Sequence, residues 1–192
     1  MDAKFILSAA KVDQFPNSNL PEIAFAGRSN VGKSSMINKL LNRKALVKVG
    51  NTPGKTRLIN FFQVDDKYMF TDLPGYGYAV VSKAEKAAWA KLIEKYFSIR
   101  RQLYLCVLLL DIRRKPNDDD LRMLEAMKFS NIETIVVLTK ADKLSGNEKF
   151  KQIKVISDTL KINKENLIPF SSITGLGREE VWNIINKIQG SR

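Results

Sequence analysis

The chain has 192 residues, of which 44% are hydrophobic, and this is enough to bury one substantial core. Its longest strongly apolar run, 103–110, is far shorter than the roughly 20 residues that span a bilayer. The N-terminal residues do not show the charged-then-apolar layout of a signal peptide, so we expect no integral membrane association. The chain has no histidine and a single cysteine, Cys106, which rules out an internal disulfide and a histidine base or zinc ligand. A cytoplasmic protein is therefore expected.

The formal net charge is +12, from 32 Lys and Arg residues against 20 Asp and Glu residues. Such a surface attracts polyanions, either nucleic acid through counterion release or anionic lipid headgroups. The alternative is a basic surface that serves solubility alone.

Residues 1–20 form a weakly patterned N-terminal extension that either adds an edge element or packs on the domain, which we place at 21–192. A first strand is expected at 23–26, and a helix at 33–41 carries its apolar residues on one face. Between them, two glycines separated by four residues are followed by Lys and Ser. This is the P-loop pattern in the strand-loop-helix context that it requires.

The P-loop residue types suit a phosphate ligand. Glycines let the backbone wrap the anion, successive N–H groups and the helix N-terminus face it, and Lys33 reaches the β and γ oxygens. The hydroxyl of Ser34 would then hold Mg²⁺. The alternative is a glycine-containing turn with a solvated lysine. The expected phosphate-binding residues are Gly27, Arg28, Ser29, Asn30, Val31, Gly32, Lys33 and Ser34.

Residues 42–56 break the helical pattern with a polar, basic segment whose length is typical of a functional loop, so we interpret it as a first switch. Two β-rich runs at 58–64 and 67–71 follow, separated by Asp65 and Asp66. They predict a hairpin at the antiparallel edge of the sheet.

The pattern Asp-x-x-Gly follows this hairpin as Asp72, Leu73, Pro74 and Gly75. Beyond a P-loop, Asp72 can approach Mg²⁺ through water and the Gly75 N–H can contact a γ-phosphate. The alternative is a plain Pro-Gly turn. A second switch is expected over 75–85, ending in a Ser-x-x-Glu capping box that begins a helix reaching about residue 97.

A continuous apolar run at 103–111 predicts a central parallel strand, and a helix to about residue 129 follows it. The next strand, 134–139, ends in Thr139, Lys140, Ala141 and Asp142. The Asp142 carboxylate can accept hydrogen bonds from N1–H and the 2-amino group of guanine, which adenine does not offer. The aliphatic stem of Lys140 would lie over the base.

A helix at 147–160, a short strand at 167–170 and a helix at 178–188 complete the chain. Backbone N–H groups after the short strand, at Ser171, Ser172 and Ile173, are candidates to contact the guanine O6 atom. The alternation predicts an α/β fold with a doubly wound, mostly parallel six-stranded sheet and one antiparallel edge strand.

In this order the motifs resemble those of Ras-like P-loop GTPases over nearly the whole chain. GRSNVGKSS, GNTPGKTRLINFF, DLPGYGYA, TKAD and SSITGLG are similar, more narrowly, to the YihA/EngB (YsxC) branch of bacterial Era-like GTPases. The resemblance implies that Thr56 ligates Mg²⁺ and senses the γ-phosphate, with Thr52 as a rival. It implies a catalytic set of Lys33, Thr56 and Gly75, and it extends the GTP-binding set to Gly54, Lys55, Thr56, Arg57 and Leu58.

The same resemblance implies GTP and GDP as ligands and a role in assembly of the large ribosomal subunit, and members have been linked to cell division or septation. Contact with rRNA would come from basic residues near the first switch, namely Lys48, Lys55 and Arg57. A monomer is the simplest expectation. A metabolic kinase is an alternative that has little use for Asp142, and a protein acting at the membrane or division septum is another.

Three positions bear on hydrolysis. Tyr76 stands where Ras-type enzymes carry a water-positioning Gln, so slow intrinsic turnover is expected. Asn30 stands where potassium-stimulated relatives coordinate K⁺, and a brace for the loop is the alternative. Thr139 replaces the usual Asn, which predicts the loss of an amide link to the P-loop.

Overall fold

The computed structural model describes residues 1–47, 58–77 and 82–189. Most of the expected first switch lies outside these residues, including Lys48, Thr52, Gly54, Lys55, Thr56 and Arg57, and so does the stretch 78–81 of the second.

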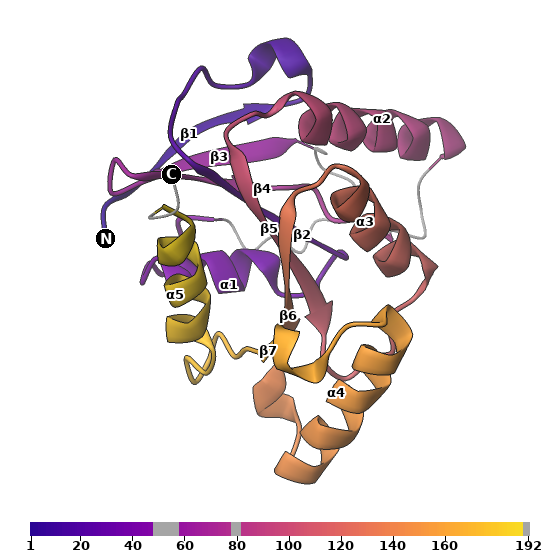
Figure 1. Cartoon of the computed structure of the whole chain (residues 1–192). Helices are drawn as coiled ribbons and strands as arrows, with labels where there is room; N and C mark the ends of the chain where they lie inside the picture. Colours follow the sequence, from indigo (N-terminus) through magenta and orange to yellow (C-terminus); the bar gives the residue numbers. More distant parts are fainter. Residues whose placement is uncertain (48–57, 78–81, 190–192) are drawn as a thin grey trace.

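A seven-stranded sheet in the order β1-β3-β4-β2-β5-β6-β7 crosses the molecule (Figure 1). The strands are β1 (Ala3–Ala9), β2 (Glu22–Gly27), β3 (Ile59–Val64), β4 (Tyr68–Asp72), β5 (Leu103–Asp111), β6 (Glu133–Thr139) and β7 (Leu167–Pro169). Neighbours from β4 to β7 pair in parallel, whereas β3 is antiparallel to both β1 and β4. The expected α/β fold is confirmed.

The sheet has one strand more than expected, because β1 pairs with β3 at the outer edge. The sequence of β1 does not show the alternation that is typical of a strand. The pairing slips between Phe5 and Leu7, which interrupts the two-residue alternation, and the Phe5 side chain is 52% exposed.

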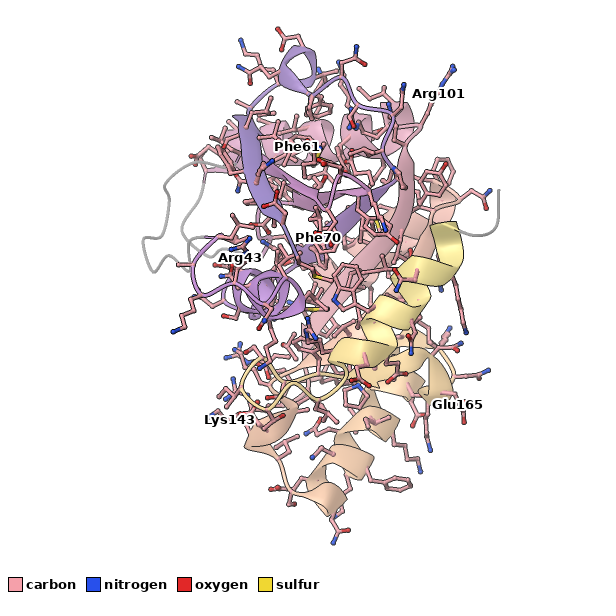
Figure 2. All side chains as sticks on the ribbon, turned by 90° about the vertical axis from the view of Figure 1, so that its left-hand side faces the viewer. Arg43, Phe61, Phe70, Arg101, Lys143 and Glu165 are labelled. Carbon is pink, nitrogen blue, oxygen red and sulfur yellow. The ribbon has the colours of Figure 1, made fainter. Side chains whose placement is uncertain are left out.

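In the described part of the chain, five α-helices cover the two faces of the sheet (Figure 1). One core contains buried residues of α2 (Lys83–Ile99), α3 (Asp118–Phe129) and α4 (Gly146–Leu160), and the other contains those of α1 (Lys33–Leu40) and α5 (Arg178–Gln189). Side chains of β5 alternate between them, as expected for a central strand: Cys106 and Leu108 lie in the first core, and Leu105 and Val107 in the second. Phe61 and Phe70, labelled in Figure 2, belong to opposite cores.

The three helices on the first face begin at capping boxes. In each box two residues three positions apart are paired, and the side chain of each accepts a hydrogen bond from the backbone N–H of the other. Ser82 and Glu85 begin α2, Asn117 and Asp120 begin α3, and Ser145 and Glu148 begin α4. These pairs fix where each helix starts relative to the strand before it.

A buried ion pair joins α2 to the start of β2. Arg100 at the end of α2 pairs with Glu22, whose side chain is fully buried, and Glu22 also accepts a hydrogen bond from Thr71 Oγ1 at 2.8 Å. Arg100 donates in addition to the Pro16 carbonyl at 3.1 Å. The residues that precede β2 are thereby tied to the end of α2.

The order of the strands places β2 between β4 and β5, while its helix α1 covers one face and α2 the other. Ligands of doubly wound sheets bind at such a point, outside the carboxyl ends of the strands. The loops that follow β2, β4, β5, β6 and β7 meet there, and they carry the sequence motifs.

Candidate nucleotide-binding site

The P-loop lies between β2 and α1, as the sequence predicts. Gly32, directly before α1, has a φ of 107°, which is the left-handed region that favours glycine. The amides of Lys33 and Ser34 follow in the first turn of α1, where no intrahelical acceptor exists, so they can donate to an anion.

The segment after β4 runs alongside the P-loop. The Leu73 N–H donates to the Phe25 carbonyl at 3.0 Å, and the Ser29 N–H donates to the Tyr76 carbonyl at 3.0 Å. At Gly75 the approach is so close that a Cβ would lie 3.0 Å from the Ser29 backbone nitrogen. A side chain would crowd the loop backbone here, and the close approach places Gly75 next to the P-loop.

Lys33 and Asp72 form an ion pair between the P-loop and the end of β4, and the two side chains are only 11% and 8% exposed. Ser34 follows Lys33 directly in the first turn of α1. Among residues 1–47, 58–77 and 82–189, no group of three acidic or sulfur side chains gathers around one point. One carboxylate and one hydroxyl suit Mg²⁺, which takes its other ligands from water and substrate phosphates.

Asn38 holds Val47, which belongs to the segment that the sequence predicts as a first switch. Its buried amide donates to the Val47 carbonyl at 2.8 Å and accepts from the Val47 N–H at 2.9 Å. Residues 42–47 are thus held against α1. The sequence does not predict this role, because an Asn on a helix gives no indication of a partner nine residues away.

Thr139 links β6 to the P-loop, contrary to the expectation that this position had lost the link. Its hydroxyl lies 2.6 Å from the Val31 carbonyl and 3.1 Å from the Leu110 carbonyl. The expectation was wrong because a threonine hydroxyl, like an asparagine amide, can donate a proton to a carbonyl. A short side chain suffices because β6 ends close to the loop.

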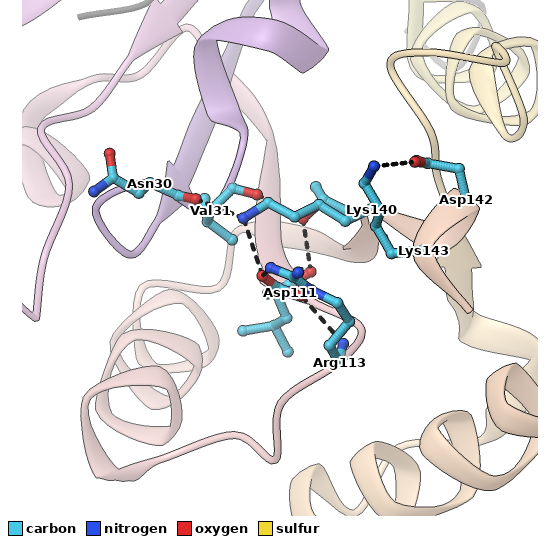
Figure 3. Close-up of polar contacts among 9 residues, drawn as sticks. Asn30, Val31, Asp111, Arg113, Lys140, Asp142 and Lys143 are labelled. Carbon is cyan, nitrogen blue, oxygen red and sulfur yellow. Dashed lines mark hydrogen bonds and ion pairs between the residues drawn. The ribbon is translucent and has the colours of Figure 1, made fainter. Parts of the chain in front are cut away.

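Lys140 bridges two loops of the site (Figure 3). Its ammonium group donates to the Asn30 carbonyl at 2.9 Å and pairs with Asp111 at 3.0 Å. The Asn30 side chain points away from Lys140, and its backbone has a left-handed φ of 61°. The side-chain amide of Asn30 is exposed and makes no contact with Lys140, which binds only the backbone carbonyl of this residue.

Asp111, at the end of β5, was not among the expected site residues. It accepts hydrogen bonds from Arg113 Nε at 2.9 Å and Nη2 at 2.7 Å, besides its pair with Lys140. Burial acts to raise the pKa of Asp111, but the hydrogen bonds from Arg113 and Lys140 outweigh it and lower the pKa to about 2. The sequence does contain one indication of this role, because Asp111 is a carboxylate at the end of an apolar strand, at the edge of the sheet where the ligand is expected.

The pKa of Asp111 predicts a pH-dependent contribution to stability. Because the folded-state pKa lies below the ordinary value of 3.8, the contribution is present above about pH 4 and is lost as the pH falls toward 2. Asp111→Asn is expected to lower the free energy of unfolding by about 1 kcal/mol at pH 7, after allowance for screening near the surface, and by less at pH 3. Urea unfolding at both pH values measures this, with the exposed Asp158→Asn as control. An equal loss at pH 7 and pH 3 would contradict it.

Asp142 and Ser171 meet at the ends of β6 and β7. Ser171 Oγ donates to Asp142 Oδ1 at 2.7 Å, and this hydrogen bond is the main reason that the pKa of Asp142 is lowered. Asp142 Oδ2 lies 3.7 Å from Lys143 Nζ (Figure 3). The carboxylate is therefore ionised and held in one orientation, as an acceptor for a base would need.

The amides after β7 are partly engaged within the protein. The Ser171 N–H donates to the Leu176 carbonyl, and the Ile173 N–H donates to Ser171 Oγ. Of the three candidate amides, that of Ser172 has no hydrogen-bond partner among the described residues. It is the one best placed to serve as a donor to a ligand.

Tyr76 is buried, and its side chain is engaged within the protein. Its hydroxyl donates to Asp120 Oδ1 at 2.9 Å, and its ring lies 6.2 Å from that of Trp89. Burial and the Asp120 carboxylate raise the pKa of Tyr76 well above its usual value, so the hydroxyl stays protonated. Asp120 thus holds both the start of α3 and the residue that follows Gly75.

Comparisons with known proteins agree with this geometry. A family described as "50S ribosome-binding GTPase" matches residues 22–140. The chain is similar to probable GTP-binding proteins EngB of Bacillus thuringiensis (strain Al Hakam), with 52% identity over 96% of this chain and 94% of the relative, and of Bacillus cereus (strain G9842), with 51% identity over 97% and 94%.

Solved structures show the same fold. A crystal structure of a probable GTP-binding protein engB matches with a TM-score of 0.74 and 25% identity, over 89% of this chain and all of that one. Era of Aquifex aeolicus bound to GDP and AlF4⁻ matches with a TM-score of 0.66 and 21% identity, over 87% of this chain and 56% of that one.

Proposed function

This chain belongs to the EngB family of P-loop GTPases, and from that premise we propose that it is a GTP-controlled switch that assists assembly of the large ribosomal subunit. The observation that carries the proposal is the match, over the P-loop and the Thr139 and Lys140 positions, to a family described by its binding to the 50S ribosome. The net charge of +12 suits an rRNA partner.

In the proposed mechanism, the P-loop amides and Lys33 hold the phosphates of GTP or GDP, and Asp142 selects guanine. Mg²⁺ would be held by Ser34 and Thr56, with Asp72 acting through water, and it supplies positive charge to the phosphates. The ion pair of Lys33 with Asp72 supports a role for Asp72 beside the P-loop, whereas Thr56 lies outside the described residues. Lys33, Thr56 and Gly75 would form the catalytic set.

The γ-phosphate would order residues 46–56 through Thr56 and residues 75–85 through Gly75, and hydrolysis would release both segments. Two contacts support such a switch. Asn38 anchors the first segment at Val47, and Tyr76 anchors the second through Asp120. Each segment is therefore held at one residue, and the conformation of its remaining residues would depend on the bound nucleotide.

Intrinsic hydrolysis is proposed to be slow, because Tyr76 offers no group to orient the attacking water. A K⁺ ion near the exposed Asn30 would compensate for missing positive charge in the transition state. GTP turnover in KCl and in NaCl at equal ionic strength tests this. We expect faster turnover in KCl, lost in Asn30→Ala, and equal rates in the two salts would rule out the ion.

Tyr76→Phe separates anchoring from catalysis. Removing the hydroxyl is expected to lower the free energy of unfolding by about 1 to 2 kcal/mol, because Asp120 loses a buried donor. GTP turnover should stay within about twofold of the original rate. Tyr96→Phe, which removes another buried hydroxyl far from the P-loop, is the matched control. A tenfold drop in turnover for Tyr76→Phe alone would make its hydroxyl catalytic.

The partner is proposed to be the large subunit and its rRNA, contacted by Lys48, Lys55 and Arg57, in a cytoplasmic monomer. In the described part of the chain, no helix is long and apolar enough to cross a membrane. Co-sedimentation with large ribosomal subunits and with anionic vesicles, each at low and high salt, distinguishes the partners. Salt-sensitive binding to subunits supports the proposal, whereas binding to vesicles alone would favour a role at the membrane or division septum.

A further inference from the structure

A groove of about 460 Å³ lies at the end of the sheet remote from the P-loop, beside the start of β6. Apolar side chains from separate parts of the chain line it. They include Ile132 before β6, Ile135 in β6, Ile162 after α4 and Ile184 in α5. All four are only partly buried within the chain.

The groove exists because β7 is shorter than its neighbour. β7 pairs with Val136, Val137 and Leu138, so the residues 133–135 of β6 extend beyond it and pair with no strand on that side among the described residues. Ile132 and Ile162 pack on one core of the molecule, and Ile135 and Ile184 pack on the other. The two cores therefore meet at a surface where the sheet no longer separates them.

The charge around the groove is opposite to that of the chain as a whole. Its lining includes three glutamates, Glu133, Glu165 (labelled in Figure 2) and Glu180, against one lysine, Lys128. All four side chains are exposed. In a chain with a net charge of +12, such a rim repels phosphate polymers and anionic lipids and attracts cations.

We propose that this groove binds a basic, extended peptide segment of another protein. Apolar side chains of the segment would enter between Ile135 and Ile162, and alternating Lys or Arg side chains would reach Glu133 and Glu165. Because β7 pairing begins only at Val136, no described strand lies along residues 133–135 on this side, and an extended segment can lie beside the start of β6. The site is separate from the nucleotide-binding loops, which lie at the other ends of the parallel strands.

The test uses a fluorescein-labelled peptide of alternating Lys and Val, with a Glu and Val peptide as control, and measures fluorescence anisotropy on the full chain. Glu133→Lys/Glu165→Lys reverses the rim, and the matched variant Glu94→Lys/Asp158→Lys makes the same charge change at exposed positions on other helices. All four substitutions lie on the surface, so folding is retained, and GDP binding serves as the check.

We expect the Lys and Val peptide to bind the original chain and to lose about tenfold in affinity to the groove variant, but less than twofold to the matched variant. The Glu and Val peptide should not bind. Equal affinity for both variants, or binding of the acidic peptide, would overturn the proposal. Light scattering that showed a dimer broken by the groove variant would also overturn it, since a second copy of this chain would then be the occupant.

Discussion

Lys33→Ala is expected to lower the affinity for GTP about 100-fold and to reduce turnover by a further 100-fold or more. The ammonium group lies against Asp72 at the base of the P-loop, where it would contact the β and γ oxygens. Charge-assisted hydrogen bonds of this kind contribute about 1.5 to 3 kcal/mol to binding, and donors to transition-state charge contribute about 3 to 4 kcal/mol. Titration with a fluorescent non-hydrolysable GTP analogue measures the affinity, and phosphate release measures the turnover.

Lys39→Ala is the matched control, because Lys39 belongs to the same helix and its ammonium group makes only a long contact of 3.4 Å with the Ile173 carbonyl. Circular dichroism must show that Lys33→Ala is folded, since Asp72 loses its buried partner. Asp72→Asn in the same chain removes that unpaired charge. If the double variant bound GTP as tightly as the original chain, Lys33 would not be a phosphate ligand.

Asp142→Asn is expected to weaken GTP binding by about 10² to 10⁴-fold. Two hydrogen bonds from guanine to an ionised acceptor would be lost, each contributing about 1.5 to 3 kcal/mol. The amide can donate through its NH₂ group, so xanthosine triphosphate, with a carbonyl in place of the 2-amino group, should gain affinity. Calorimetric titration with both nucleotides measures the change.

Asp158→Asn, on the exposed face of α4, controls for the loss of one charge. Ser171→Ala adds a graded test, because it leaves Asp142 ionised but removes the hydrogen bond that orients it. A weaker loss, about tenfold, is expected there. Unchanged preference for GTP over xanthosine triphosphate in Asp142→Asn would show that the base lies elsewhere.

The elements that could be predicted from the sequence are those whose signals are local. The P-loop begins at the end of a buried strand and ends in the first turn of α1, and the Ser82, Asn117 and Ser145 caps begin three helices. Each of these signals lies within a few residues of the feature that it predicts. The sequence does not decide between an edge strand and a packed extension for residues 1–20, because the register shift in β1 interrupts the alternation that would indicate a strand.

The contacts that the sequence did not predict join residues that are not close neighbours in the chain. Tyr76 meets Asp120, Lys140 meets Asp111, and Asn38 meets Val47. Each residue type also has an ordinary local role, as a cap or an exposed charge, so nothing in the sequence marks the partner. Thr139 shows the same limit, since only the close approach of β6 to Val31 makes a hydroxyl sufficient.

The most direct test of the switch is co-sedimentation with purified large ribosomal subunits in GDP, in a non-hydrolysable GTP analogue and without nucleotide. The account predicts the largest bound fraction with the GTP analogue, and predicts that Asp142→Asn loses this increase. Equal binding in all three states would contradict it, because the γ-phosphate would then have no influence on the surface that the partner contacts.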